Sequence, residues 1–364
     1  MSLKASFVSH LIQKYPHLNS AHLDNLVSDR LISPFQITLS EVQVSTIKSE
    51  IKKYWQLREW GKLQLSEKYA TYDLRKPDNY SACMSYDFHI NPAGEPELIE
   101  INTNASFLAL GIELYSFLNL PNTFNETDLV QMFRDEGATQ SVAIIDENPE
   151  AQRLYVEFLI YQELFRKQGL KSEIFNIDNI SSLKDFSLVY NRYTDFYLQT
   201  ETAKTLREKF NSGELRLSPT PFEYFLLADK QRLLDWNLQM AVPKPASLLK
   251  IYDLGTEDKD KVWSERKSLF FKPKNSFGGK QAYKGASISR KVFEEVFNKD
   301  FIAQQLSVPA EIETEFENQK IKFKYDLRCF VYRDKLQLMV ARLYQGQTTN
   351  LKTAGGGFAC VRIS

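Results

Sequence analysis

The chain has 364 residues, of which 43% are hydrophobic and 25% are charged, and its 46 Lys and Arg residues balance 46 Asp and Glu residues. That length and composition are typical of a globular protein with two or three folding units and exclude wholesale disorder. A net charge of zero disfavours a dedicated nucleic-acid-binding protein, and no apolar run approaches the roughly 20 residues that a membrane helix needs. The three cysteines lie far apart without a CxxC pair, and the first residues do not resemble a signal peptide, so we expect a cytoplasmic protein.

The first part of the chain, up to about residue 138, is predicted to form helices around one β-hairpin. Apolar residues recur every three or four positions in residues 4–68, which predicts helices, and Ser40 with Gln43 has the pattern of a capping box. Further on, the pattern predicts a strand at 80–90, a turn at 91–96, a strand at 97–103 and a return to helix at 107–137.

The middle of the chain, residues 139–218, alternates predicted strands with predicted helices. Such alternation is typical of a parallel α/β layer. The strands are expected at 141–146, 170–177 and 186–191, and the helices at 149–169 and 202–213.

Residues 219–364 begin with a predicted helix at 221–237 and continue as strands that are separated by polar turns. The clearest strands are expected at 268–274, 300–308 and 324–344.

Scarce residue types narrow the chemistry that the chain can perform. It has four histidines, three of them in the first helical stretch, which disfavours a zinc site. The sequence contains no GxxxxGK[ST] pattern, no GxGxxG after a strand and no GxSxG pattern. P-loop, Rossmann and Ser-His-Asp sites are therefore disfavoured, and any catalysis must rely on carboxylates, Lys, Arg and backbone amides.

Two polar residues alternate in the second strand of the predicted hairpin. Glu100 and Asn102 are two positions apart, so both side chains leave the same face of the sheet. Carboxylate and amide oxygens are hard ligands that suit Mg²⁺ when it bridges phosphates. The same pattern fits an exposed strand face, and this alternative stays open.

A second candidate lies at the end of the predicted strand 268–274. Lys272 ends an apolar run and precedes the glycine-containing loop KNSFGGKQAYKG. A lysine delivered by a strand can pair with phosphate while loop amides surround the anion. An ordinary basic surface turn would have the same composition.

Charged residues also alternate in the apolar strand 324–344, where Asp326, Arg328 and Arg342 face either water or a cleft. Three glycines follow at 355–357, and they either allow a backbone to approach a ligand closely or form a flexible tail. Together, these strand carboxylates, the lysine, the arginines and the two glycine loops indicate Mg²⁺–nucleotide chemistry without a Walker motif.

The segment IEINTNASF at residues 99–107, with the hairpin before it, closely resembles the metal-binding segment of eukaryotic-type glutathione synthetases. These are ATP-grasp ligases with a circularly permuted order of elements, in which the ExN strand comes first. The similarity extends from about residue 70 to the end and includes LRKPDNY, LVYNRYTDFY, LLADKQRLL, FFKPKNSFGGKQAYKG, IAQQLSVP and AGGGFAC.

The fold that this resemblance implies is a circularly permuted ATP-grasp fold of the α+β and α/β classes. It implies N-terminal helices with the metal-binding hairpin in residues 1–138. A parallel α/β substrate domain would follow in 139–218, and the nucleotide-binding lobes in 219–364.

The resemblance also implies roles for individual residues. The Mg²⁺ ligands would be Glu100, Asn102 and Asp326, of which Asp326 would replace a family glutamate at the position of Ser276. Lys272 and Arg342 would be catalytic. ATP would contact Lys230, Lys272, Ser276, Gly278, Gly279, Gln281, Gln304, Gln305, Leu306 and Asp326. The substrate would contact Arg75, Ser106, Arg192, Gly357 and Phe358.

The implied reaction is the ATP- and Mg²⁺-dependent ligation of a carboxylate to an amine through an acyl-phosphate, which gives an amide and ADP. The expected substrate is an amino acid or a short peptide. No nucleic-acid or membrane partner is expected, and a homodimer remains open. The alternative is an inactive ATP-binding protein with a regulatory or partner-binding role, which the serine at position 276 favours.

Overall fold

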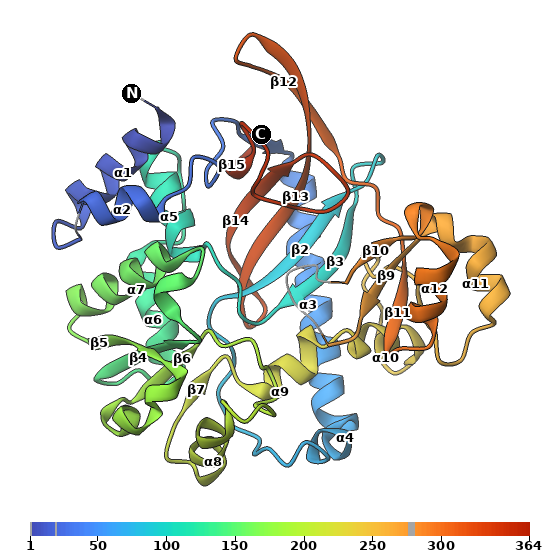
Figure 1. The fold of residues 1–364 in the computed structure, drawn as a ribbon, viewed down its shortest axis with the longest axis horizontal. Coiled ribbons are helices and arrows are strands. Elements are labelled where there is room, and N and C mark those ends of the chain that lie inside the picture. The colour runs from blue at the N-terminus through green and yellow to red at the C-terminus, as the bar shows by residue number, and fades with distance from the viewer. Residues whose placement is uncertain (1, 19, 276–280) are drawn as a thin grey trace.

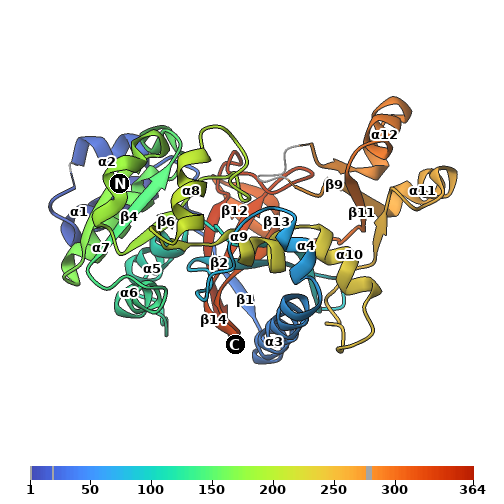
Figure 2. The same cartoon turned by 90° about the horizontal axis from the view of Figure 1, so that it is seen from below.

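The structure is a computed structural model that describes residues 2–18, 20–275 and 281–364. Within those residues the chain forms three β-sheets with helices around them. Figure 1 shows a parallel sheet in green on the left, a central sheet in the middle and a small sheet in orange on the right, and Figure 2 shows the same arrangement from below. The mixed architecture that the sequence predicts is confirmed. The residue bounds of the three domains stay a prediction.

The central sheet has seven strands in the order β1-β15-β14-β13-β2-β3, with β12 paired to β13. Its register places Asp87 opposite both Arg328 and Glu100, and Asp326 opposite Arg342. Because residues that face one another across antiparallel strands share a side of the sheet, these charged residues lie on one face. The strands are β1 (Ile37–Leu39), β2 (Met84–Ile90), β3 (Pro96–Asn102), β12 (Glu311–Phe316), β13 (Gln319–Tyr332), β14 (Lys335–Tyr344) and β15 (Gly357–Ile363).

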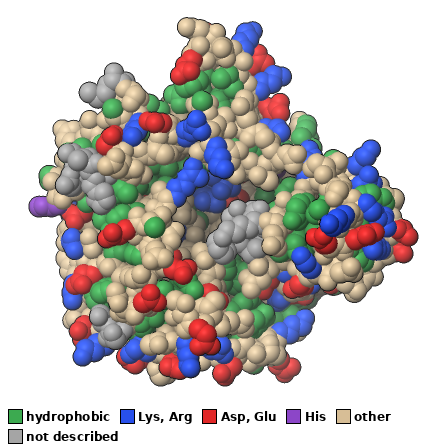
Figure 3. All heavy atoms as spheres, viewed as in Figure 1, with side chains coloured by type: hydrophobic (Ala, Val, Ile, Leu, Met, Phe, Trp, Pro, Cys, Tyr) green, Lys and Arg blue, Asp and Glu red, His purple; other side chains and the backbone are tan. Residues whose placement is uncertain are grey.

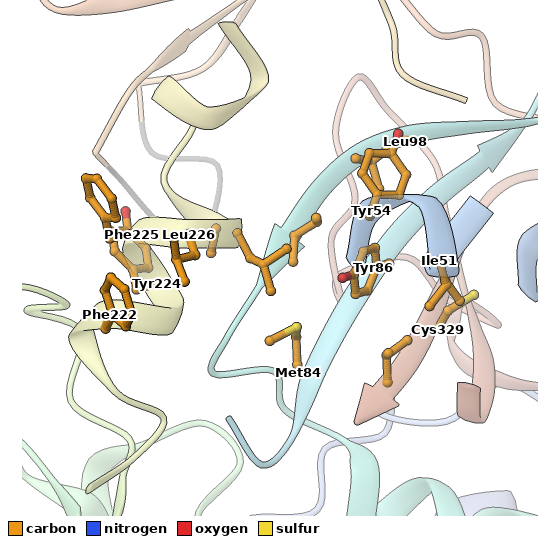
Figure 4. Packing of buried hydrophobic residues seen from close by; sticks show 14 of the residues in the cluster. Ile51, Tyr54, Met84, Tyr86, Leu98, Phe222, Tyr224, Phe225, Leu226 and Cys329 are labelled. Carbon is orange, nitrogen blue, oxygen red and sulfur yellow. The ribbon is translucent and has the colours of Figure 1, made fainter. Parts of the chain in front are cut away.

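The opposite face of the central sheet is apolar and packs on the helix α3 (Glu41–Gln64). Tyr86 and Cys329 are buried there beside Ile51 and Tyr54, and the rings of Tyr54 and Tyr86 lie 5.8 Å apart (Figure 4). The alternation of side chains along each strand therefore gives the sheet an apolar face toward α3 and places the charged residues on the other face. The predicted capping box at the start of α3 is confirmed, since Ser40 and Gln43 each accept the other's backbone N–H.

The first 138 residues are largely helical, as predicted, with two differences. The short strand β1 lies inside the region predicted to be helical, because it pairs in parallel with Val361–Ile363 at the far end of the chain. The helix predicted at 107–137 is two helices, and Asn125 caps the second one. The helices are α1 (Leu3–Lys14), α2 (Ser20–Leu26), α3, α4 (Ser66–Ala70), α5 (Leu108–Phe117) and α6 (Glu126–Asp135). None of the helices described in the structure is long and apolar enough to cross a lipid bilayer.

The parallel sheet has the order β5-β4-β6-β7, and each pair of neighbouring strands is parallel. The predicted parallel α/β layer is thus confirmed. Asp146 ends β4 and Arg192 follows β6, at the strand ends where open α/β sheets bind ligands. The elements are β4 (Ser141–Asp146), β5 (Lys171–Asn176), β6 (Leu188–Asn191) and β7 (Leu217–Ser218), with 3-10 turns at Pro149–Ala151 and Ile177–Asp185 and the helices α7 (Tyr155–Lys167) and α8 (Lys204–Ser212).

The small sheet has the order β10-β9-β11-β8, and Phe271 packs on Phe293 of the helix that covers it. Its elements are β8 (Ile251–Asp253), α11 (Lys259–Glu265), β9 (Leu269–Pro273), β10 (Tyr283–Lys284), α12 (Arg290–Phe297) and β11 (Phe301–Gln305), with 3-10 turns at Arg266–Ser268 and Gly285–Ser287.

The segment before the small sheet differs from the single helix predicted at 221–237. A first turn, α9 (Pro221–Glu223), leads into a π-helical turn (Tyr224–Ala228), and the helix α10 (Gln231–Leu238) follows a break. At the break Asp229 has an extended backbone, and its N–H donates to the Tyr224 carbonyl, five residues back. The break places Lys230 at the start of α10, and π-helical turns are frequent at functional sites.

Candidate functional site

A cavity of about 480 Å³ lies between the central sheet and the small sheet, a size that suits a small-molecule ligand. Strands of the central sheet supply one wall, and β9, β11 and the start of α10 supply the other. Figure 3 shows Lys and Arg side chains gathered where the molecule is hollowed between these two parts. The predicted site residues in the cavity lining are Glu100, Asn102, Lys230, Lys272, Gln304, Gln305, Leu306, Asp326 and Arg342.

An ion-pair network on the central sheet forms the floor of the cavity. Asp87 Oδ2 accepts hydrogen bonds from Arg328 Nη2 at 2.8 Å and from Arg342 Nη2 at 2.9 Å. Arg342 also binds Asp326 in a bidentate manner, with Nε to Oδ1 at 2.7 Å and Nη2 to Oδ2 at 2.9 Å. Two arginines and two carboxylates from three strands are therefore held in one rigid group.

The buried carboxylate of Asp87 is the centre of this network. Burial by itself would raise the pKa of Asp87, but the guanidinium groups of Arg328 and Arg342 hold it at about 2. Burial would likewise lower the pKa of Arg342, whereas Asp326 and Asp87 raise it above its ordinary range. Asp87 and Arg342 therefore stay charged at physiological pH, and the network holds two guanidinium groups in fixed positions beside an anionic ligand.

Glu100 and Asn102 lie beside the network, on the face of the sheet that also carries Asp87. Asn102 Nδ2 donates to Asp87 Oδ2 at 3.2 Å, which turns the Asn102 carbonyl oxygen away from Asp87. Among the described residues, no group of three or more His, Cys, Asp or Glu side chains could hold a metal ion. One carboxylate and one amide oxygen still fit Mg²⁺ that takes its other ligands from water and substrate phosphates.

The carboxylate of Asp326, which is predicted to bind a metal, already has hydrogen-bond partners in the structure. Both of its oxygens accept hydrogen bonds from Arg342, and Thr349 Oγ1 donates to Oδ2 as well. Asp326 thus acts first as the partner of Arg342. Its role as a metal ligand stays a prediction.

Lys272 reaches the cavity from β9 on the opposite side. Its ammonium donates to the Ile99 carbonyl at 2.9 Å and to Gln304 Oε1 at 2.6 Å, and Gln304 Nε2 donates to the Leu98 carbonyl at 3.2 Å. These bonds join the small sheet to β3. Burial lowers the pKa of Lys272 to about 8, an effect that Glu100 opposes and Lys230 strengthens.

Six further residues are predicted to contact ATP. Gln305 and Leu306 follow along β11 into the segment that links the two sheets, and the Leu306 N–H donates to the Ser268 carbonyl. Gln281 is exposed with a φ of 58°, next to the lining residue Ala282. The predictions for Ser276, Gly278 and Gly279 lie outside the described residues.

Arg192 and Ser106, both predicted to bind the substrate, are in direct contact. Arg192 Nη2 donates to Ser106 Oγ at 2.5 Å, while Nη1 donates to the Tyr190 hydroxyl at 3.1 Å and to Asn104 Oδ1. Arg192 is 7% exposed, and its Nε is buried with no partner among the described residues. The pair lies at the carboxyl end of β6 and outside the lining of the cavity.

A hydrogen bond nevertheless connects this pair to the cavity. Arg328 Nη1 donates to the Ser106 carbonyl at 3.3 Å, and Arg328 is itself bound to Asp87. The loop that carries Ser106 is thus shared by the Arg192 pair and the floor of the cavity.

The three other residues predicted to bind the substrate are engaged in packing contacts within the protein. Gly357 and Phe358 belong to β15, where the Phe358 ring stacks on Phe107 at 3.6 Å. A Cβ atom on Gly357 would lie 2.8 Å from the carbonyl oxygens of residues 30 and 31, so the glycine serves a close approach of two backbones. Arg75 lies over the ring of Phe210 at 5.0 Å, away from the cavity lining. Packing explains these positions without a substrate, and their binding roles stay predictions.

Sequence reasoning missed Asp87 and His89, and it singled out Arg328 as a strand charge without assigning it a binding or catalytic role. His89 lines the cavity, its Nδ1 lies 3.1 Å from Ser307 Oγ, and burial lowers its pKa. The signal was present in the strand MSYDFHI, where Asp87 and His89 alternate with apolar residues directly before the ExN strand. Glu100 and Asp87 are neighbours across a hairpin that the sequence itself predicts.

Comparison with known proteins gives a likeness in fold. No family model and no curated protein matches the sequence. A solved structure of a glutathione synthetase-like effector from Globodera pallida superposes with a TM-score of 0.54 at 10% identity, over 92% of this chain and 90% of that chain.

Two further structures are less alike. One is named as a gamma-glutamylcysteine synthetase from Methylobacillus flagellatus, with a TM-score of 0.42 at 11% identity over 84% and 83% of the two chains. The other is the ATP-grasp ligase PsnB, with a TM-score of 0.32 at 10% identity over 61% and 88%. Identity this low concerns the fold alone, and the permuted order of elements stays a prediction. The chain has a glutathione synthetase-like fold.

Proposed function

We propose that the protein is an ATP- and Mg²⁺-dependent ligase that joins a carboxylate to an amine through an acyl-phosphate. The observation that carries this proposal is the cavity between the two sheets. There two fixed arginines and the ExN pair face two lysines across a space that fits a small-molecule ligand. A cationic cavity in which the Glu100 carboxylate is available to a metal suits a triphosphate.

In the proposed reaction a carboxylate oxygen of the substrate attacks the γ-phosphorus of ATP, and ADP leaves. An amine nitrogen then attacks the acyl carbon, phosphate leaves, and the nitrogen loses a proton to give the amide. Lys272 and Arg342 would hold the transferring phosphoryl group from opposite walls, so that their contribution is positioning and charge stabilisation. No covalent nucleophile of the protein is required.

Mg²⁺ would be held by Glu100 and the carbonyl oxygen of Asn102, and it would neutralise charge on the phosphates. The protein fixes the Asn102 side of this donor pair through Asp87, which binds the Asn102 amide and both arginines. One buried carboxylate therefore orients the metal-binding and the anion-binding side of the cavity together.

For the substrate we propose an amino acid or a short peptide whose free carboxylate is recognised near Arg192 and Ser106. The hydrogen bond from Arg328 to the Ser106 carbonyl places this region next to the cavity floor. Among the compared structures, PsnB was solved with a minimal precursor, Mg and ADP.

A second candidate is an ATP-binding protein without ligase activity. It is favoured by the engagement of Asp326 with Arg342 and Thr349, because only one of the two predicted carboxylate ligands, Glu100, then remains available to a metal.

The two candidates are separated by measuring ADP release with Mg·ATP and pools of amino acids and short peptides. The ligase is expected to release ADP only when both a carboxylate and an amine are present. Glu100→Gln serves as the matched control, because it keeps the size of the side chain and removes its charge. Binding of Mg·ATP without ADP release from any pool would favour the second candidate.

A further inference from the structure

The loop after β6 is connected to the cavity through the π-helical turn. This loop, residues 192–200, starts at Arg192 on the substrate side of the protein. Two of its aromatic residues contact the turn: Phe196 stacks on the Tyr224 ring at 4.2 Å, and the Tyr197 hydroxyl donates to Asp229 Oδ2. The contact between the two regions is therefore both apolar and polar.

Tyr197 is held firmly in place. Its side chain is 2% exposed, and its ring stacks on Tyr72 with centroids 4.0 Å apart and an interplanar angle of 12°. The Tyr224 ring meets it edge-on at 5.1 Å. A buried hydroxyl with a carboxylate partner is costly to leave unpaired, so the bond to Asp229 is a constraint on both residues.

Asp229 in turn constrains the backbone around the next residue, Lys230. Its Oδ2 binds Tyr197, while its Oδ1 accepts from the Gln231 N–H at 2.9 Å. The carboxylate thus fixes the backbone on either side of Lys230, whose own N–H donates to the Lys274 carbonyl and whose side chain lines the cavity. The backbone of Asp229 is extended and separates the π-helical turn from α10.

A second connection between the loop after β6 and the cavity runs through the same π-helical turn. The Tyr224 hydroxyl donates to Asn275 Oδ1 at 3.0 Å, just after the end of β9. Both branches lead from the loop after β6 to the wall of the cavity that carries Lys230 and Lys272.

We propose that Tyr197 is a positioning residue that acts through Asp229 to hold Lys230 in the orientation that binds the nucleotide. The inference rests on the proposed function, because it takes the cavity as the site of ATP. Its consequence is that the substrate-side loop and the nucleotide site are coupled. Such coupling is reciprocal, so a ligand that orders the loop would also tighten nucleotide binding.

The test is a double-mutant cycle read out as the Kd of Mg·ATP by calorimetry. Tyr197→Phe removes the hydroxyl and keeps the ring stacked on Tyr72. We expect it to weaken Mg·ATP binding by about 3- to 10-fold, the range that one lost hydrogen bond accounts for. In a Lys230→Ala background the same change is expected to have no further effect, because the residue through which it acts is gone.

Tyr193→Phe is the matched control, since Tyr193 is a buried tyrosine of the same loop whose hydroxyl pairs with Thr200 Oγ1 instead. It is expected to change the Kd by less than about 2-fold. Equal losses from Tyr197→Phe in the wild-type and Lys230→Ala backgrounds would overturn the inference, and so would an equal loss from Tyr193→Phe.

Asp229→Asn provides a second route if Tyr197→Phe lowers the melting temperature. It weakens the same bond by removing the charge of the acceptor, and its effect on the Kd should again vanish without Lys230. If the wild-type protein does not bind Mg·ATP, the proposed function itself fails. If it binds Mg·ATP and the losses are additive, only the role of Tyr197 fails.

Discussion

Raising the pH should weaken the binding of Mg·ATP because Lys272 loses its proton. Burial places the pKa of Lys272 at about 8 in the free protein, and only the ammonium form can pair with a phosphate oxygen. If the neutral form does not bind, the apparent Kd grows by the factor 1 + 10^(pH − pKa). This factor is about 1.3 at pH 7.5 and about 11 at pH 9, so the Kd should rise by about 8-fold over that range.

Calorimetry between pH 7.5 and 9 measures this effect, because the phosphates of ATP are fully ionised there. Titrations at pH 9 in two buffers of different ionisation enthalpy should also show the uptake of about 0.9 proton on binding, which is the fraction of Lys272 that must recharge. Lys272→Arg is the control, since a guanidinium stays protonated at both pH values. Its Kd should not change with pH.

A loss of stability caused by Lys272 cannot account for weaker binding of Mg·ATP at high pH. The pKa of Lys272 is lower in the folded protein than in an unfolded chain, so the unfolded state binds more protons between pH 8 and about 10.4, and this group makes the folded state more stable as the pH rises. A wild-type Kd as independent of pH as that of Lys272→Arg, without proton uptake, would refute the assignment of Lys272 to the phosphates.

Four substitutions test other parts of the structure. Asp87→Asn removes the buried charge that holds two arginines and should lower the free energy of unfolding by about 3 kcal/mol in urea denaturation, where an unchanged midpoint would contradict the network. Glu100→Gln should reduce the rate of ADP release far more than the affinity for Mg·ATP, because a metal ligand matters most when charge develops on the phosphoryl group. Arg192→Lys should raise the KM of the carboxylate substrate and leave the Kd of ATP unchanged, whereas an unchanged KM would move carboxylate recognition elsewhere. Gly357→Ala should lower the melting temperature by several degrees, because its φ of 114° and a Cβ 2.8 Å from two carbonyl oxygens leave no room for a side chain, and a normal melting curve would contradict this close approach of the two backbones.

The sequence alone predicts those parts of the site that depend on local pattern. Glu100 and Asn102 share a face because strands alternate, and Lys272 enters the cavity because an apolar strand delivers it. The parallel α/β layer follows equally from the alternation of strands and helices. In each case the information lies within a few residues of the group concerned.

The parts that sequence reasoning missed depend on pairing between distant segments. Asp87 meets Arg328 only because β2 pairs with β13, and β1 exists only because it pairs with β15. Gly357 and Phe358 also take part in contacts between distant segments. Gly357 allows β15 to pack closely against residues 30 and 31, and the Phe358 ring stacks on Phe107, while their predicted substrate contacts stay predictions.

The most direct test of the ligase proposal is to trap the acyl-phosphate with hydroxylamine in place of the amine. The wild-type protein with Mg·ATP and a pool of amino acids and short peptides should form a hydroxamate and an equal amount of ADP, and Glu100→Gln should form neither above background. ADP formation that is independent of the carboxylate, or binding of Mg·ATP without any hydroxamate, would contradict the proposed ligation.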